Sequence, residues 1–216
     1  MGFLLCILFF VLYISTMLKA IIFDLSEVLL RGLLGTEDYL KETYGLEIEN
    51  SKWKIKELEH FFHGQITEEE YWAAVVKEYH LPLSVDQLKA AVRSNFKEIE
   101  GTRNIIISLK EKGYKLGLLS VHTKEWVEYC EEKLGYHQLF DSTMYSFEVS
   151  VSKPDTKAYQ LILEKLQIQP NEGLFIDDTL INVEAASQLG IQALQFFSAS
   201  QLKKDIQNLG INMAKK

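Results

Sequence analysis

Five short runs rich in apolar residues, each bounded by polar residues, stand out along the chain. Runs of this length predict strands buried on both faces, as in a parallel sheet. The first begins at Lys19, and the others cover residues 115–119, 143–147, 173–176 and 192–196. Amphipathic stretches that predict helices follow them, at residues 102–113, 123–134, 155–166, 181–189 and near the C-terminus. This alternation predicts an α/β fold with a doubly wound, Rossmann-like parallel sheet.

Between the first strand and residue 100 the pattern predicts helices alone. Four amphipathic stretches occur there, at residues 36–44, 53–62, 67–79 and 84–96. Thr36 is an expected N-cap, and Thr67 followed by Glu70 is the capping-box pattern. We therefore expect a small helical cap domain at residues 33–99, inserted into an α/β core made of residues 17–32 and 100–216. Placed at the active edge of the sheet, such a bundle would act as a lid.

Residues 1–16 are nearly all apolar, but the run is shorter than the roughly 20 residues that a membrane helix needs. A secretory signal requires a Lys or Arg before the apolar run and a cleavage pattern of small residues after it. Neither is present here. The buried strand begins at Lys19. A membrane helix ending near Met17 would therefore press the sheet against the bilayer, with no linker between the two. We expect Met17 to be the natural start and residues 1–16 to be an upstream extension. The alternative is a membrane anchor.

Composition and charge narrow the possible functions. The 216 residues are 47% hydrophobic, and the formal net charge is −7. Without a basic surface to neutralise phosphates, nucleic acid is not an expected partner. Cys6 and Cys130 are the two cysteines and lie far apart in the sequence, so a disulfide framework is not expected. These features predict an ordinary globular protein of the cytoplasm.

Polar residues follow four of the predicted strands directly or in the next loop. Asp24 follows the first, Ser120 the second, Lys153 lies after the third, and Asp177 with Asp178 follows the fourth. The carboxyl ends of parallel strands share one edge of a sheet, and ligands bind there in open α/β sheets. Taken alone, Asp24 would be interpreted as a turn or helix cap, where Asp is common. Together the five residues predict one site.

The residue types in this site predict a chemistry. Three carboxylates at one edge would raise one another's pKa unless a cation lay between them. Mg²⁺ suits such ligands, because it binds one or two carboxylates together with phosphate oxygens and water. The hydroxyl of Ser120 and the ammonium of Lys153 suit the remaining phosphate oxygens. Asp24 is then placed to attack phosphorus and form an aspartyl-phosphate.

Four segments, FDLSEVLL, GLLS, SKPDTKAY and LFIDDTLINVEAASQLG, resemble in order and spacing the four motifs of the haloacid dehalogenase-like hydrolase superfamily. The resemblance runs from Met17 to the C-terminus. The helical stretch after the first motif resembles the type 1 cap of that superfamily, and HGQITEEEYW resembles the entry to its helices. The resemblance implies an α/β core that carries the site and a cap that covers it.

The resemblance also implies roles for single residues. Asp24 is the implied nucleophile and a Mg²⁺ ligand, and the backbone carbonyl of Ser26 is a further ligand. Ser120 and Lys153 are the implied phosphate-binding residues. The metal ligands of the fourth motif are implied to be Asp178 first, supported by Asp177 and Asn182.

Ser26 departs from the superfamily pattern, in which phosphatases usually carry a second Asp at this position. That Asp protonates the leaving oxygen, and general acid–base catalysis contributes roughly 10²- to 10⁴-fold. Its loss penalises poor leaving groups most, so an anomeric sugar phosphate or an acyl phosphate would suffer least. Sugar 1-phosphate phosphatases resemble this chain in lacking it. Glu27 is a possible substitute acid, although we expect a solvent-facing side chain there.

The segment after Ser120 departs as well, since Val121 stands where many relatives have Asn, and His122 follows it. His122 is a candidate substrate or phosphate contact, because an unperturbed imidazole titrates near neutrality. The alternative is that it caps the next helix or faces solvent. The remaining expectations concern the cap. We expect surface or hinge positions for His60, His63 and His80. We expect core positions for Trp53 and Trp72, with the substrate pocket as the alternative.

Three functions remain open at this point. The first is a Mg²⁺-dependent phosphatase of small phosphorylated metabolites such as sugar phosphates. The second is a 2-haloacid dehalogenase, which would use Asp24 as nucleophile without a metal. The third is a catalytically weak relative used for binding or regulation, for which Ser26 and Val121 argue. The paired Asp177 and Asp178 favour the first.

Overall fold

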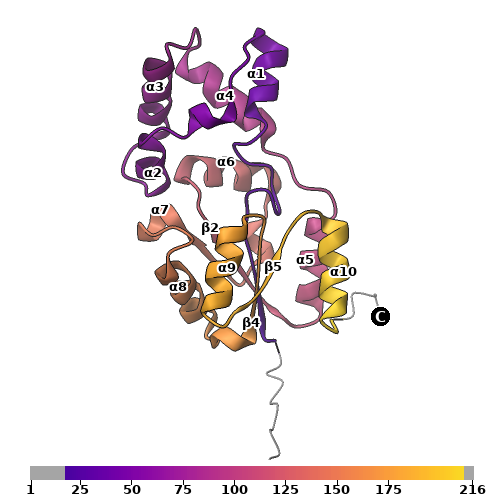
Figure 1. Ribbon diagram of the computed structural model, residues 1–216. Helices are drawn as coiled ribbons and strands as arrows, with labels where there is room; N and C mark the ends of the chain where they lie inside the picture. Colours follow the sequence, from indigo (N-terminus) through magenta and orange to yellow (C-terminus); the bar gives the residue numbers. More distant parts are fainter. Residues whose placement is uncertain (1–17, 212–216) are drawn as a thin grey trace, which may run out of the picture.

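The computed structural model describes residues 18–211, and its centre is a sheet of five parallel strands (Figure 1). The strand order is β3-β2-β1-β4-β5. The strands are β1 (Ala20–Phe23), β2 (Lys115–Ser120), β3 (Ser142–Tyr145), β4 (Gly173–Asp177) and β5 (Gln192–Gln195). The predicted doubly wound parallel sheet is therefore confirmed. The ends of β2, β4 and β5 lie within one residue of the prediction, whereas the third strand ends two residues early, because Ser146 and Phe147 already belong to a short helix, α7 (Ser146–Val149).

The central strand β1 is buried on both faces, as its unbroken apolar run predicts. Ile21 and Phe23 face one apolar cluster, whereas Ala20 and Ile22 face the other. Phe23 pairs with Leu118 of β2 on one side and with Ile176 of β4 on the other. The chain therefore leaves the middle of the sheet at Asp24, between two neighbouring strands.

Helices cover both faces of the sheet. On the side of Ile21 and Phe23 lie α5 (Thr102–Glu111), α6 (Lys124–Leu134) and α10 (Ala199–Asn208). On the other side lie α8 (Thr156–Leu166) and α9 (Leu180–Gln188). Figure 1 shows α5 and α10 together on one side of the sheet and α8 and α9 on the other. Two short 3-10 helices complete the core, η2 (His137–Leu139) and η3 (Pro170–Glu172).

The helices between β1 and α5 form a group of their own, called here the helical insert (residues 36–95). β1 leads toward it, so it lies at the end of the sheet where the strands finish (Figure 1). The insert consists of α1 (Thr36–Tyr44), η1 (Asn50–Trp53), α2 (Glu57–Phe62), α3 (Glu68–Tyr79) and α4 (Val85–Asn95). The predicted capping box at Thr67 and Glu70 is present at the start of α3.

Two helix predictions in the insert are wrong in detail. The helix predicted at residues 53–62 is broken, because the carbonyl oxygen of Trp53 accepts a hydrogen bond from the Tyr71 hydroxyl at 2.7 Å. The N-cap of α1 is Gly35, with φ of 95°, and not Thr36. The left-handed conformation suits glycine there.

No helix within residues 18–211 has both the length and the apolar character needed to cross a bilayer. Residues 1–16 lie outside the described residues. Both interpretations of that segment, and the cytoplasmic location, stay predictions.

Candidate active site

Two strand ends bring the acidic residues together. Asp24 follows β1, and its N–H group donates to the carbonyl oxygen of Ile176 in β4 at 2.9 Å. Asp177 is the last residue of β4, and Asp178 follows it. Within the described part of the chain, Asp24, Asp177 and Asp178 offer carboxylate oxygens that lie within 4.8 Å of one another. The structure therefore gathers all three predicted carboxylates.

Lys153 reaches the same cluster from the loop after α7. Its Nζ lies 2.9 Å from Oδ2 of Asp24 and 2.5 Å from Oδ2 of Asp177, and its side chain is 1% exposed. Burial alone would lower the pKa of Lys153, but the charges of Asp24 and Asp177 outweigh it and raise the pKa. The lysine is thus held as a cation.

Asp177 is fixed by a set of donors from the start of α9. Asn182 Nδ2 donates to both carboxylate oxygens, at 3.0 and 3.2 Å. The N–H group of Thr179 donates to Oδ1 at 2.8 Å. Together with Lys153, these contacts determine the orientation of a fully buried carboxylate. Asp178 is only partly buried and keeps an accessible carboxylate.

The cluster is short of positive charge. Burial, together with the nearby Asp177 and Asp178, raises the pKa of Asp24 to about 7 although Lys153 acts in the opposite direction. Burial and Asp177 likewise raise the pKa of Asp178. Three carboxylates face one ammonium, and a divalent cation would balance the remaining charge. The oxygen donors of Asp24 and Asp178 fit Mg²⁺ in type and spacing.

Ser120 ends β2 beside β1 and has the feature expected of an anion ligand. Its Oγ is buried and makes no hydrogen bond to any described residue. A buried hydroxyl without a partner costs roughly 1–3 kcal/mol. An oxygen of a bound phosphate would supply the missing acceptor.

The segment from Leu25 to Gly32, called here the flap, shows that Glu27 was interpreted wrongly. Glu27 is not solvent-facing, since its side chain is 15% exposed. Its Oε2 accepts from Arg31 Nη1 at 2.9 Å and its Oε1 accepts from the N–H group of Gly32 at 2.8 Å. Both oxygens are therefore occupied within the flap. Ser26 is partly buried and pairs with Leu30 in an isolated bridge.

His122 does not have the near-neutral pKa that its candidacy assumed. The side chain is buried, and burial lowers its pKa to about 4. Nδ1 accepts a hydrogen bond from the N–H group of Thr123 at 3.0 Å, so the neutral ring carries its proton on Nε2. The ring packs edge-on against Trp126, with 5.7 Å between centroids. A role in substrate binding would therefore be that of a neutral donor.

The other candidates in the insert are distributed as follows. His60 and His80 are exposed, whereas His63 bonds through Nε2 to Ser152 Oγ at 2.9 Å. Trp53 and Trp72 are fully buried and pack edge-to-face, with centroids 5.7 Å apart. The two tryptophans are thus core residues.

Two polar residues near the site escaped the sequence reasoning. The Ser146 hydroxyl, at the end of β3, bonds to the backbone of both His122 and Phe62. Glu68, buried in α3, bonds to Trp126 of α6. Ser146 had a usable signal, because it is a polar residue at a strand's carboxyl end. Glu68 had none, since glutamates in the first turn of a helix are common.

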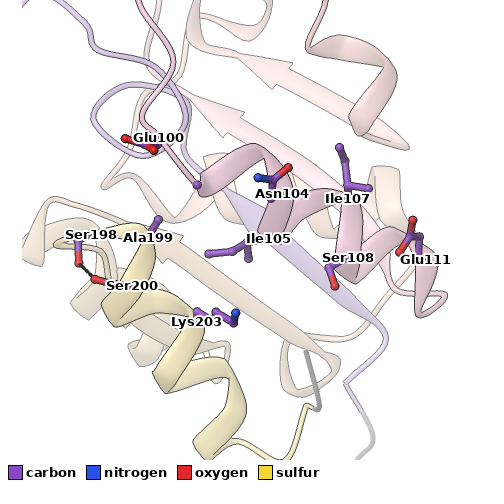
Figure 2. A pocket seen from close by; sticks show the side chains of 11 residues that line it. Glu100, Asn104, Ile105, Ile107, Ser108, Glu111, Ser198, Ala199, Ser200 and Lys203 are labelled. Atoms are coloured by element: carbon purple, nitrogen blue, oxygen red, sulfur yellow. Dashed lines mark hydrogen bonds between the residues drawn. The ribbon is translucent and has the colours of Figure 1, made fainter. Parts of the chain in front are cut away.

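A groove of about 870 Å³ lies elsewhere, between α5 and α10 (Figure 2). Asn104 and Ser108 of α5 and Ser200 and Lys203 of α10 are among its lining residues. None of the predicted site residues lines it. The candidate active site is therefore defined by its chemistry at the strand ends.

Known proteins resemble this chain over most of its length. A family model described as haloacid dehalogenase-like hydrolase matches residues 21–196. Flavin mononucleotide hydrolase 1 of Arabidopsis thaliana is 28% identical over 130 residues, or 60% of this chain and 53% of that protein. The phosphorylated carbohydrates phosphatase of Thermotoga maritima is 27% identical over 187 residues, or 82% of this chain and 84% of that protein. The chain thus spans about half of the first relative and most of the second.

Solved structures share the fold. A HAD family enzyme of Bacteroides thetaiotaomicron, in complex with magnesium and inorganic phosphate, superposes with a TM-score of 0.70 at 24% identity and covers 84% of this chain and 95% of that one. The L-2-haloacid dehalogenase of Xanthobacter autotrophicus superposes with a TM-score of 0.64 at 19% identity and covers 91% of this chain and 85% of that one. At these identities the likeness concerns the fold.

Proposed function

Because the chain belongs to the haloacid dehalogenase-like hydrolase family, we propose that it is a Mg²⁺-dependent phosphatase of small phosphorylated metabolites. The observation that carries the proposal is the cluster of Asp24, Asp177 and Asp178 around a single buried ammonium. The excess of negative charge favours a metal-dependent reaction, whereas a dehalogenase would need no metal. The activities for which the flavin mononucleotide hydrolase and the carbohydrate phosphatase are named agree with a phosphate ester as substrate.

In this proposal Asp24 attacks the phosphorus atom. A bond forms between a carboxylate oxygen of Asp24 and phosphorus, and the bond from phosphorus to the leaving oxygen breaks. Lys153 and the unpartnered hydroxyl of Ser120 bind phosphate oxygens. Water then hydrolyses the aspartyl-phosphate, which releases phosphate and restores the carboxylate.

The metal would be held by Asp24, Asp178 and the backbone carbonyl of Ser26. Mg²⁺ in that place would neutralise charge on the phosphate oxygens. Asp177 would act indirectly, because Lys153, Thr179 and Asn182 already take up its oxygens. Its role is to position Lys153 and to add negative charge.

We also propose the division of the chain into a core, residues 17–32 and 100–216, and a cap at residues 33–99. The helical insert lies over the strand ends, which is where a cap would exclude bulk water during the reaction.

The substrate class follows from the absence of an acid at Ser26. Glu27 does not replace the missing Asp, because both of its oxygens are bonded within the flap. The leaving oxygen must therefore depart with little protonation. We propose anomeric sugar phosphates or acyl phosphates, whose leaving groups need the least help.

The test is phosphate release from the full-length protein, with and without Mg²⁺, across sugar phosphates, nucleotides, flavin mononucleotide and acyl phosphates. Asp24→Asn is the blank, since an amide is no nucleophile, and we expect its rate to fall at least about 1000-fold. Release that requires both Mg²⁺ and Asp24 supports the proposal. If the folded protein releases no phosphate but binds it, the chain is a binding relative. Halide release from a 2-haloacid without Mg²⁺ would make it a dehalogenase.

Ser26→Asp tests the leaving-group argument. The substitution restores an acid, so hydrolysis of poor leaving groups should accelerate more than that of good ones. An equal change for both would contradict this account.

A further inference from the structure

The Ser146 hydroxyl lies between two segments that are far apart in the sequence. It accepts a hydrogen bond from the N–H group of His122 at 3.1 Å. It donates to the carbonyl oxygen of Phe62 at 2.7 Å, and the carbonyl oxygen of His122 lies at 3.2 Å. Ser146 is buried. One side chain of the core thus joins the loop after β2 to the last residue of α2 in the insert.

A hydroxyl has one proton, so only one of the two carbonyl groups receives it. While the insert lies against the core, the hydroxyl donates its proton to the carbonyl oxygen of Phe62, which is the nearer of the two. If the insert moves away, the carbonyl of His122 is still within reach. The hydroxyl can therefore release the insert without becoming an unpaired buried group.

The end of α2 is closely fitted to the core at this point. Gly64 has φ of 68°, and a Cβ atom there would lie 3.2 Å from the carbonyl oxygen of Phe147. His63 adds its bond to Ser152, immediately before Lys153. The contact through Ser146 is thus part of a continuous joint between the insert and the segment that leads to Lys153.

The loop held by Ser146 follows Ser120 directly, which is the last residue of β2. Ser120 pairs with Tyr145 in the parallel register of β2 and β3, which places Ser146 one residue beyond that pair. Beyond this loop, in α6, the indole of Trp126 donates to Glu68 of the insert at 2.8 Å. The segment from Ser120 to Trp126 is therefore bonded to the core at one point and to the insert at another.

We propose that Ser146 is a positioning residue: its hydroxyl links Phe62 of the insert to the backbone of His122, so that Ser120 takes its phosphate-binding position only when the insert is seated. This inference rests on the proposed function. It adds a connection between closure of the insert and assembly of the phosphate site. Ser146 itself touches no substrate.

The kinetic test is a double-mutant cycle of Ser146→Ala and Ser120→Ala in the full-length protein with Mg²⁺. We expect Ser146→Ala to lower kcat about tenfold, as a small displacement of a catalytic group does. If it acts through Ser120, it should have little further effect in the Ser120→Ala background. Independent, additive losses would overturn the proposal, since a merely structural role gives that result. Ser146→Thr, which keeps the hydroxyl, should restore most of kcat.

A second measurement needs no turnover. The chain has three tryptophans. Trp53 and Trp72 lie in the insert and Trp126 lies beneath it, and each is at most 2% exposed. Tryptophan emission and its quenching by acrylamide therefore report whether the insert is seated.

We expect Ser146→Ala to shift the emission to longer wavelength and to increase quenching, and inorganic phosphate with Mg²⁺ to reverse part of the shift. The matched control is Ser94→Ala, whose hydroxyl donates to the carbonyl of Ala91 within α4, and its emission should equal that of the wild type. Wild-type emission and quenching in Ser146→Ala would overturn the link to the insert. Failure of the proposed function is distinguishable, because it would abolish phosphate release in the wild type and leave the fluorescence result readable.

Discussion

Within residues 18–211, buried carboxylates lie in two regions that differ in how their negative charge is compensated. At the strand ends, Asp24, Asp177 and Asp178 share the single ammonium of Lys153. At the joint between the insert and α6, Glu68 is 3% exposed and forms an ion pair with Arg93. Its oxygens accept bonds from Arg93 Nη1 and Nη2, at 2.8 and 2.6 Å, and from the indoles of Trp126 and Trp72, at 2.8 and 3.3 Å.

The difference separates a structural joint from a reactive site. Glu68 is paired with Arg93 and both of its oxygens are bonded, so this ion pair connects α3 to α4, and the bond from Trp126 adds α6. Around Asp24 the charges do not balance and the pKa is raised. A perturbed carboxylate in a cluster of like charge is typical of a functional site, whereas a paired one is typical of structure.

The largest effect on stability should come from Glu68→Ala. Removing one partner leaves the guanidinium of Arg93 partly buried without its counterion, which typically costs about 3–5 kcal/mol. Urea unfolding of the variant measures this free energy. Glu69→Ala is the control, because Glu69 is exposed and pairs with Lys89 at the surface. Equal stability of the two variants would contradict a structural role for the Glu68–Arg93 ion pair.

Asp24→Asn should have the opposite effect and increase stability in the absence of metal. The folded pKa of Asp24 is about 7, above its ordinary value of 3.8, so the folded state binds the proton more tightly than the unfolded state. Stability is therefore lost as pH rises from about 4 through 7. At pH 8 with EDTA, the variant should be more stable by about 4 kcal/mol.

The difference should shrink at pH 4 or when Mg²⁺ is added to the wild type, which mass action stabilises. Thermal unfolding at both pH values, with and without Mg²⁺, checks this. A variant less stable than the wild type at pH 8 in EDTA would show that the strand-end cluster is not short of positive charge.

His122 should give a smaller effect with the reverse pH dependence. Its folded pKa is about 4 and its ordinary value 6.5, so the unfolded state takes up the proton first as pH falls. Stability is complete above pH 6.5 and is lost as pH falls through 6.5 toward 4. His122→Gln keeps an acceptor for Thr123 but does not titrate. Between pH 7 and 4 the wild type should lose about 3 kcal/mol more than the variant. Parallel losses would place the imidazole in contact with water.

Glu27→Gln should change least. The amide oxygen can still accept from the N–H group of Gly32, and the bond to Arg31 is largely exposed. We expect kcat to stay within about twofold, in contrast to the 10²- to 10⁴-fold expected for a general acid. Steady-state kinetics on one sugar phosphate measures it. A large loss of kcat would instead indicate that Glu27 is the general acid and that the flap takes part in catalysis.

Several features of the molecule followed from the sequence without any structure. The apolar runs predicted the parallel sheet, and the polar residues after them predicted that Asp24, Asp177, Asp178 and Lys153 would meet. The physical reason is general, since parallel strands end at one edge and adjacent ends lie close together. The capping box at Thr67 is equally local, because it depends on residues three positions apart.

Tertiary structure alone decided how each side chain is bonded. Glu68 reaches Trp126 across 58 positions of sequence, and Ser146 reaches Phe62 across 84. His122 was expected to titrate near neutrality, but burial among residues that include Trp126 and Phe96 lowers its pKa. The composition of the strand ends is thus determined by local sequence. Burial, pairing and pKa depend on which distant segments pack together, and one chain read in order carries no direct record of those contacts.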